Sequence, residues 1–123
     1  LLSAGEAVAA KEAGADGVVV SNHGARQVDA APSAIEVLPA IREAVGPGFP
    51  LLADGGVRTG LDIMRFLAKG ADMVLAGRAF HIAVAALGED GAHHAMHVLR
   101  EELSITMGQI GCERPADLPR FLA

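Results

Sequence analysis

The sequence contains no tryptophan, no tyrosine and a single cysteine, and it has no long apolar run. Because tyrosine is absent, a reaction carried by this chain takes no phenol group from it. Cys112 has no partner for an internal disulfide, which excludes a disulfide-stabilised scaffold. No stretch approaches the roughly 20 apolar residues that a membrane-spanning helix requires. We therefore expect a cytoplasmic location.

Positive charge is also scarce. Lys and Arg number 10 against 15 Asp and Glu, which gives a formal net charge of -5. Binding to nucleic acid or to an acidic membrane needs a basic patch, so neither partner is expected. The 123 residues, of which 51% are hydrophobic, suit one globular domain or part of one. Because the chain begins Leu1-Leu2-Ser3, without an initiating Met or a signal peptide, we expect a fragment of a longer protein.

Signals for helices and strands alternate along the chain. Short runs near 17–21, 51–54 and 73–76 are continuous and apolar, which is typical of parallel strands buried on both faces. Capping boxes predict three helix starts: Ser3 with Glu6, Ser33 with Glu36, and Thr59 with Asp62. A long amphipathic helix from Asp90 to Ile110 is predicted by the apolar series Ala92, Met96, Leu99, Leu103, Met107 and Ile110. This order predicts an α/β fold with a parallel sheet.

Polar residues and glycines follow each of the three predicted strands. The loops are Ser21-Asn22-His23-Gly24-Ala25-Arg26, Asp54-Gly55-Gly56-Val57-Arg58 and Gly77-Arg78. In parallel α/β folds, ligands bind beyond the carboxyl ends of the strands, which lie along one edge of the sheet. The sequence therefore predicts a single site built from these three loops.

The second and third loops have the features of an anion site. Glycine lets backbone N–H groups approach an anion, a following helix N-terminus adds partial positive charge, and Arg offers a planar fork that matches phosphate. A tight turn explains Asp54-Gly55-Gly56 equally well, but a Gly-Arg pair one unit later favours phosphate. We expect the N–H groups of Gly56 and Gly77 and the guanidinium of Arg78 to converge on one phosphate-sized space.

The first loop combines a histidine with an arginine. The side chain of His23 can exchange protons near neutral pH, and Arg26 can bind a carboxylate with two parallel hydrogen bonds. Together they predict a base and an anchor for an acidic substrate. A surface histidine is the alternative for His23, and its place at a strand end favours the catalytic interpretation.

Other reactive side chains are expected to have structural or solvent-exposed positions. No metal site is predicted at His93, His94 and His97, because no carboxylate lies at a recognised ligand spacing. His81 is expected to pack in a helix, and Cys112 to be a buried, inert thiol. The four methionines are expected in the core: Met64, Met73, Met96 and Met107.

These loops resemble those of FMN-dependent 2-hydroxy acid oxidases and dehydrogenases, the family of glycolate oxidase and flavin-linked L-lactate dehydrogenase. The resemblance covers nearly the whole chain and rests on three ordered motifs: Gly14-Ala15-Asp16-Gly17 leading to Ser21-Asn22-His23-Gly24-Ala25-Arg26-Gln27, then Asp54-Gly55-Gly56-Val57-Arg58-Thr59-Gly60, then Gly70-Ala71-Asp72 leading to Gly77-Arg78-Ala79-Phe80. It implies a (β/α)8 barrel, of which residues 1–123 form the last three β/α units and the closing helices. Three strands cannot close a barrel, so we expect an open sheet with helices on one side.

The resemblance also implies roles for individual residues. His23 is similar to the family's active-site base, Arg26 to its carboxylate anchor, and Ser21 to a residue close to the flavin. The residues that resemble the FMN site are Asp54, Gly55, Gly56, Arg58, Gly77 and Arg78. The implied reaction oxidises a small L-2-hydroxy acid of the lactate or glycolate class to the 2-oxo acid. The first proton can leave from the carbon or from the oxygen of the substrate, and the sequence does not decide between the two.

The resemblance leaves several properties open. The family's lysine, tyrosines and histidine-orienting carboxylate come from earlier strands, so the chain is not expected to be active alone. Oxygen, a quinone and a cytochrome all remain as electron acceptors. The intact protein is expected to be a homo-oligomer, with attachment to the inner membrane surface as an alternative to a free cytoplasmic form. The rival interpretations are another phosphate-binding barrel, similar to type 2 isopentenyl diphosphate isomerase, and a non-catalytic remnant.

Overall fold

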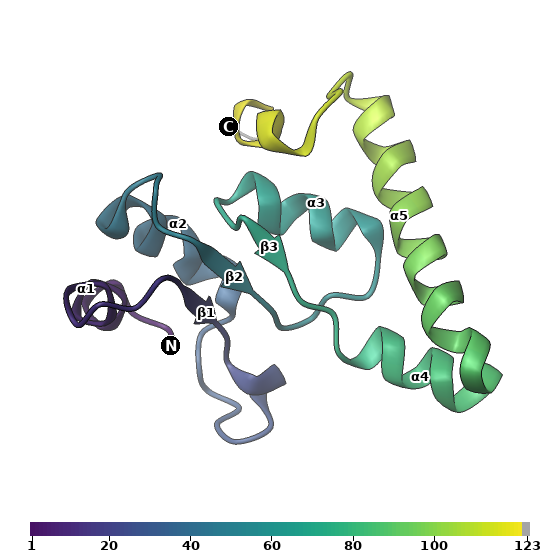
Figure 1. Cartoon of the computed structure of the whole chain (residues 1–123), viewed down its shortest axis with the longest axis horizontal. Helices are drawn as coiled ribbons and strands as arrows, with labels where there is room; N and C mark the ends of the chain where they lie inside the picture. The colour runs from purple at the N-terminus through teal and green to yellow at the C-terminus, as the bar shows by residue number, and fades with distance from the viewer. Residues whose placement is uncertain (122–123) are drawn as a thin grey trace.

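Helices and strands alternate in the computed structural model, which describes residues 1–121 (Figure 1). The elements are α1 (Ala4–Glu12), β1 (Val18–Val20), α2 (Ala34–Val45), β2 (Leu51–Ala53), α3 (Gly60–Ala68), β3 (Met73–Val74), α4 (Arg78–Leu87) and α5 (Gly91–Gln109). Short 3-10 segments lie at His23–Ala25, Gly88–Asp90 and Pro115–Arg120. All three predicted capping boxes are present, at the N-termini of α1, α2 and α3.

The three strands form one parallel sheet in the order β1-β2-β3. Val18 pairs with Leu51 and Val20 with Ala53, while Leu52 pairs with Met73. This register brings the carboxyl ends of neighbouring strands to the same level. The predicted α/β class and parallel pairing are therefore confirmed, and the loops that follow the strands share one edge of the sheet.

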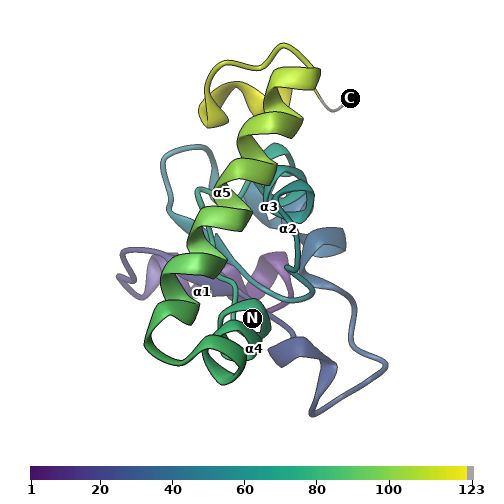
Figure 2. The same cartoon turned by 90° about the vertical axis from the view of Figure 1, so that its right-hand side faces the viewer.

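One face of the sheet carries the main apolar core. Val20, Leu51 and Ala53 are fully buried there against the α2 side chains Leu38 and Ile41. Burying a Leu or Ile side chain contributes about 1.5–3 kcal/mol, so this contact accounts for much of the stability of the sheet. A second cluster joins α3, α5 and the last 3-10 segment, and Figure 2 shows α5 running past α3 and α4.

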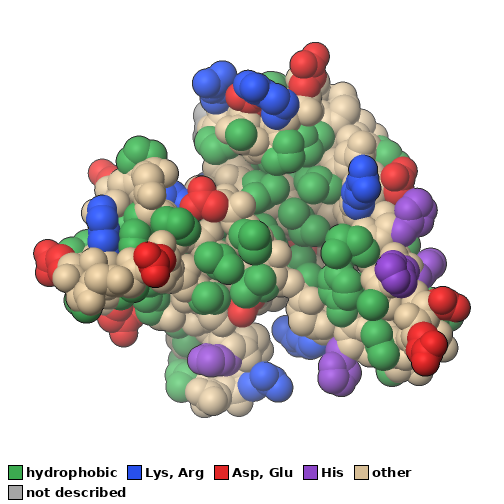
Figure 3. All heavy atoms as spheres, viewed as in Figure 1, with side chains coloured by type: hydrophobic (Ala, Val, Ile, Leu, Met, Phe, Trp, Pro, Cys, Tyr) green, Lys and Arg blue, Asp and Glu red, His purple; other side chains and the backbone are tan. Residues whose placement is uncertain are grey.

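The opposite face of the sheet is open. Val19, Leu52 and Met73 form one row across the three strands. Val19 is 41% exposed and Met73 is 57% exposed, and Figure 3 shows apolar side chains gathered over the sheet on this face. Strands whose two faces are both apolar belong to sheets that are covered on both sides. The expected open barrel interior is therefore confirmed.

Two expectations about the apolar side chains are wrong. Met73 and Met96 are 57% and 58% exposed, so only Met64 and Met107 serve as core methionines. Met73 faces the open side of the sheet, which explains its exposure. The buried side of α5 also differs from the predicted series, because it consists of Gly91, Ala95, Leu99 and Met107.

Glycine contacts set the orientation of α5. A Cβ on Gly91 would lie 2.3 Å from the carbonyl oxygen of Ala83 in α4. A Cβ on Gly60 at the start of α3 would lie 2.2 Å from the backbone nitrogen of Leu103. These two backbone contacts turn Ala95 inward and leave Ala92 and Met96 outside. Apolar periodicity alone does not reveal contacts of this kind, since glycine contributes no side chain to the pattern.

Candidate active site

The three loops that follow the strands line one cavity of about 790 Å³. This volume lies within the range of about 300–1,000 Å³ that is usual for small-molecule sites. All nine residues predicted for the site lie on its wall: Ser21, His23, Arg26, Asp54, Gly55, Gly56, Arg58, Gly77 and Arg78. The shared edge of the parallel sheet therefore brings together residues that are up to 57 positions apart in the sequence.

The loop after β1 has a strained backbone. Positive φ angles occur at three consecutive residues, with 54° at His23, 65° at Gly24 and 61° at Ala25. Residues other than glycine seldom adopt this left-handed conformation, and each such residue costs of order 1–3 kcal/mol. Strain of this kind is concentrated at active sites and ligand clamps. The segment that carries His23 is therefore the strained part of the loop and a candidate for a functional role.

Hydrogen bonds hold this turn in place. The N–H of His23 donates to Ser21 Oγ at 3.1 Å, and the N–H of Ala25 donates to the Asn22 carbonyl at 3.0 Å. Arg26 Nε donates to the His23 carbonyl at 3.3 Å, which ties the arginine to the same turn. Ser21 therefore orients the backbone of the histidine as well as lining the cavity.

The loop after β2 presents a carboxylate and two glycines to the cavity. Asp54 Oδ1 is buried and has no hydrogen-bond partner within the described residues. A buried acceptor without a partner is costly, so this atom is suited to a donor on a ligand. Gly55 and Gly56 have φ angles of 99° and 80°, which an L side chain rarely adopts. No atom lies within 4 Å of a Cβ placed on Gly56.

The N-terminus of α3, just beyond this loop, is closed to ligands. Asp62 Oδ2 accepts hydrogen bonds from the N–H groups of Arg58 and Thr59, and Glu102 accepts from Gly60 at 2.7 Å. Partial burial raises the pKa of Asp62, but the hydrogen bonds from Arg58 and Thr59 lower it more, so the pKa lies below its usual value. The positive end of α3 that the sequence suggested for an anion is thus occupied by two carboxylates.

The N-terminus of α4 is open instead. Its N-cap is Gly77, which has no side chain to cap the helix, and the first turn contains no acidic residue. Arg78 follows directly, and its Nη2 atom lies 3.3 Å from a Cβ placed on Gly24. The Arg78 guanidinium therefore reaches across the cavity to the turn that carries His23. An uncapped helix N-terminus beside an arginine is a favourable position for an anion.

Charges on the cavity wall differ from those of the whole chain. The wall holds three arginines, Arg26, Arg58 and Arg78, and one carboxylate, Asp54, whereas the chain has a net charge of -5. Figure 3 shows basic and histidine side chains on both sides of a recess at the lower edge of this face. The wall of the cavity is therefore locally basic, although the chain as a whole is acidic.

His81 is a residue of the site that the sequence interpretation missed. It was expected to be packed inside a helix, but it is exposed and lines the cavity with Ile82. The expectation is wrong because α4 lies at the rim of the site, with no buried residue of its own. Helical spacing places His81 on the same face as Arg78, three residues earlier, and this signal identifies it.

Other histidines and the cysteine are not part of this cavity. His93, His94 and His97 are exposed, and no group of three or more potential metal ligands occurs within residues 1–121. Cys112 is buried, as expected, and its thiol contacts the Arg114 carbonyl. No helix in the described part of the chain is long and apolar enough to cross a membrane.

The sequence matches the family of FMN-dependent dehydrogenases over residues 1–123. The chain belongs to this family. It is 52% identical over 106 residues to an L-lactate oxidase of Alicycliphilus denitrificans, and 50% identical over 107 residues to an L-lactate dehydrogenase of Stenotrophomonas maltophilia. It is also 48% identical over 120 residues to a peroxisomal (S)-2-hydroxyacid oxidase of Arabidopsis thaliana. These regions cover 86%, 87% and 98% of this chain, respectively.

Solved structures agree with this assignment. The chain is similar to mandelate oxidase with benzoyl-formic acid, with a TM-score of 0.93 and 44% sequence identity. The matched region covers 98% of this chain and 36% of the mandelate oxidase chain. A mandelate oxidase variant with a monooxide FMN adduct gives the same score and identity. The chain is thus an open part of a (β/α)8 barrel, and FMN is the cofactor that its family indicates.

The chain spans about a third of the length of the proteins it matches. It covers 29% of the L-lactate oxidase, 28% of the L-lactate dehydrogenase and 33% of the hydroxyacid oxidase. The relatives give no support to the isomerase alternative. Statements about the activity and substrate of the whole protein are therefore made below as proposals.

Proposed function

We propose that this chain supplies the base, the carboxylate anchor and the cofactor-phosphate site of an enzyme that oxidises a small L-2-hydroxy acid to its 2-oxo acid. The observation that carries the proposal is the single cavity that joins His23 and Arg26 to the glycine loops and Arg78. Relatives named for lactate and for 2-hydroxy acids support the substrate class. Lactate is the first substrate to test.

The cavity fits FMN in three respects. Asp54 Oδ1 lacks a protein partner and suits a hydroxyl of the ribityl chain. Open space lies beside both Gly56 and Gly77, where a Cβ would otherwise fill the wall. The uncapped N-terminus of α4 and the arginines suit the phosphate. Gly55, Gly56, Gly77, Arg58 and Arg78 would hold the phosphate end, and Ser21 would lie closer to the isoalloxazine ring.

The substrate's chemistry assigns tasks to the first loop. A 2-hydroxy acid loses two electrons and two protons when it becomes a 2-oxo acid, and bound FMN would accept the electron pair and one of the protons. His23 takes one proton on its imidazole, which is suited to this near neutral pH. Arg26 holds the carboxylate, and its hydrogen bond to the His23 carbonyl keeps anchor and base together. The rigid, strained turn fixes the distance between them.

Flavin reduction by substrate tests the proposal in the intact protein that contains this chain. The test is an anaerobic stopped-flow measurement with L-lactate. The His23→Gln variant should still bind FMN, but lactate should reduce its flavin about 10²–10⁴ times more slowly than in the parent, because this is the usual contribution of a general base. Arg26→Lys keeps the charge but loses the planar fork, so it should mainly raise the lactate concentration needed for half-maximal reduction. His97→Gln is the matched control, because this exposed histidine lies outside the cavity.

Three results would contradict the proposal. One is purified intact protein that binds no FMN. Another is bound FMN that none of L-lactate, glycolate and L-mandelate reduces. The third is a His23→Gln variant whose flavin is reduced at the same rate as in His97→Gln, because His23 would then not be the base.

A further inference from the structure

Asn22 directly precedes the catalytic turn, and the proposed function gives it no role. Its side chain makes two hydrogen bonds: Oδ1 accepts from the N–H of Gly24 at 3.0 Å, and Nδ2 donates to the carbonyl of Pro32 at 3.4 Å. The first bond spans the strained residue His23. The second joins the two ends of the excursion from residue 22 to residue 32, which leads into α2.

The same amide also lies close to the neighbouring loop. A Cβ placed on Gly55 would lie 3.1 Å from Asn22 Oδ1. The sheet register explains this proximity, because Val20 pairs with Ala53 and the next residues of the two strands continue side by side. Gly55 has a φ of 99°, so its backbone conformation favours glycine, and a Cβ there would press against the Asn22 side chain. Asn22 Oδ1 is therefore packed between the catalytic turn and the loop proposed to hold FMN.

The far side of the turn is fixed as well. Gly24 lies against the guanidinium of Arg78, so the turn is held between Asn22 on one side and Arg78 on the other. A left-handed turn with two residues other than glycine is stable only when its surroundings determine it. The Asn22 amide is the side chain that satisfies the N–H at the centre of this turn.

We propose that Asn22 is a positioning residue that holds His23 at the substrate and couples the catalytic turn to the Gly55 loop. This inference rests on the proposed function for its kinetic part. The loss of the amide is expected to loosen both loops at once, because the same oxygen bonds to one loop and lies beside Gly55 of the other. Asn22 does not touch the reacting atoms, and its effect on the reaction passes through the placement of His23.

Two substitutions of Asn22 separate positioning from folding. Asn22→Ala removes both hydrogen bonds. Asn22→Ser retains a short acceptor that can bond to the N–H two residues later, but it does not reach Pro32. Val28→Ala is the matched control, because Val28 is 59% exposed in the same excursion. All variants are made in the intact protein, and rates are expressed per bound flavin so that a smaller folded fraction does not affect them.

The kinetic arm measures flavin reduction at saturating L-lactate. Asn22→Ala should slow it about 10- to 100-fold, since a displacement of about 1 Å of a catalytic group costs this much. Asn22→Ser should recover most of the loss, and Val28→Ala should equal the parent. A merely structural role predicts less flavin-loaded protein with an unchanged rate per bound flavin, and this result would overturn the proposal.

The second arm does not depend on activity. Amide hydrogen exchange is followed in peptides that cover residues 21–33 and 54–58. Asn22→Ala should speed exchange in both, and Val28→Ala in neither. Unchanged exchange at 54–58 would overturn the coupling between the loops. If no 2-hydroxy acid reduces the parent's flavin, the proposed function fails, and the exchange data alone then decide whether Asn22 links the two loops.

Discussion

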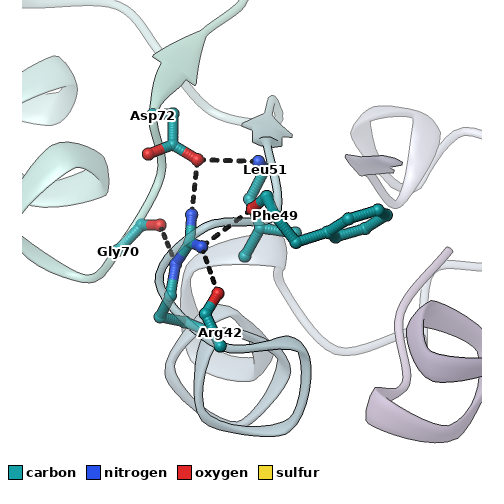
Figure 4. Close-up of polar contacts among 6 residues, drawn as sticks. Arg42, Phe49, Leu51, Gly70 and Asp72 are labelled. Carbon is teal, nitrogen blue, oxygen red and sulfur yellow. Dashed lines mark hydrogen bonds and ion pairs between the residues drawn. The ribbon is translucent and has the colours of Figure 1, made fainter. Parts of the chain in front are cut away.

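Arg42 on α2 bonds to four residues in the segments before β2 and β3, at the end of the sheet opposite the cavity (Figure 4). Its Nε donates to the Gly70 carbonyl at 2.9 Å, and Nη1 donates at 2.8 Å to the carbonyls of Gly46 and Phe49. Nη2 forms an ion pair with Asp72, whose Oδ2 also accepts the N–H of Leu51 at 2.8 Å. We predict that removal of this guanidinium strongly destabilises the sheet.

The expected magnitude follows from burial. Each hydrogen bond to a charged group contributes about 1.5–3 kcal/mol, but carbonyls that regain water recover part of this. Gly46 and Gly70 are half-buried and can be rehydrated, whereas Phe49 is buried. The Asp72 side chain is 53% exposed, so solvent screens its attraction to Arg42. Counting the Phe49 bond in full and the others in part, Arg42→Ala should lower the free energy of unfolding by about 3–5 kcal/mol.

Urea unfolding of the intact protein measures this change. Arg42→Lys should recover less than half of the loss, because an ammonium group cannot reach three directions with fixed planar geometry. Arg65→Ala is the control, since Arg65 pairs with Asp62 at 3.6 Å and its side chain is 54% exposed; it should change stability by about 0.5 kcal/mol or less. A loss below about 1 kcal/mol for Arg42→Ala would refute the reasoning, because it would mean that water replaces the guanidinium at little cost.

The remaining predictions concern glycines and pH. Gly60→Ala should destabilise the intact protein by about 2 kcal/mol or more in urea unfolding, because its Cβ would meet the α5 backbone. Gly108→Ala on α5, with no atom near its Cβ, should instead stabilise it by about 0.5–1 kcal/mol. Gly56→Ala should weaken FMN binding in a fluorescence titration, since φ is 80° there and the Cβ would fill proposed ligand space. The pKa of Asp62 is lowered in the folded protein, so its carboxylate stabilises the fold at pH values above the unfolded pKa near 3.8. This stabilisation is lost as the pH falls through the folded pKa. The difference in unfolding free energy between the parent and Asp62→Asn should therefore shrink at low pH.

The sequence predicted the fold well where residues close together in the chain decide the local structure. The capping pairs that begin α1, α2 and α3 are all formed, because each involves residues only three positions apart. The strands are two or three residues long and lie within the predicted ranges. The errors concern long-range contacts. His81 and Met96 lie on helices whose orientation depends on backbone contacts at Gly91 and Gly60, and periodicity does not report these.

The sequence was enough to predict which residues form most of the site, but not how they are arranged. Position after parallel strands was enough to bring nine residues to one cavity. The capture of the α3 N-terminus by Glu102 was not predictable, because that residue is 42 positions away on α5. The left-handed backbone at His23 and Ala25 was hidden for a different reason, since alanine seldom adopts positive φ and histidine does so in only a minority of cases. The resemblance to the family supplied the roles that geometry alone leaves open.

The two ends of the sheet have opposite energetic characters. At the carboxyl ends, His23 and Ala25 hold strained conformations that together cost about 2–6 kcal/mol. At the amino ends, the Arg42 network joins the segments before β2 and β3 and contributes about 3–5 kcal/mol. These magnitudes are similar, and the two sets of contacts are joined through the short strands and through α2, which follows the loop after β1 and carries Arg42. If the amino end becomes less stable, the strained catalytic turn should open more easily. Arg42→Ala should therefore also speed hydrogen exchange at residues 21–33, which lie at the far end of the sheet from the substitution. If exchange there is unchanged while global stability falls, neither the strands nor α2 transmit stability between the two ends, and local contacts with Ser21, Asn22 and Arg78 hold the turn.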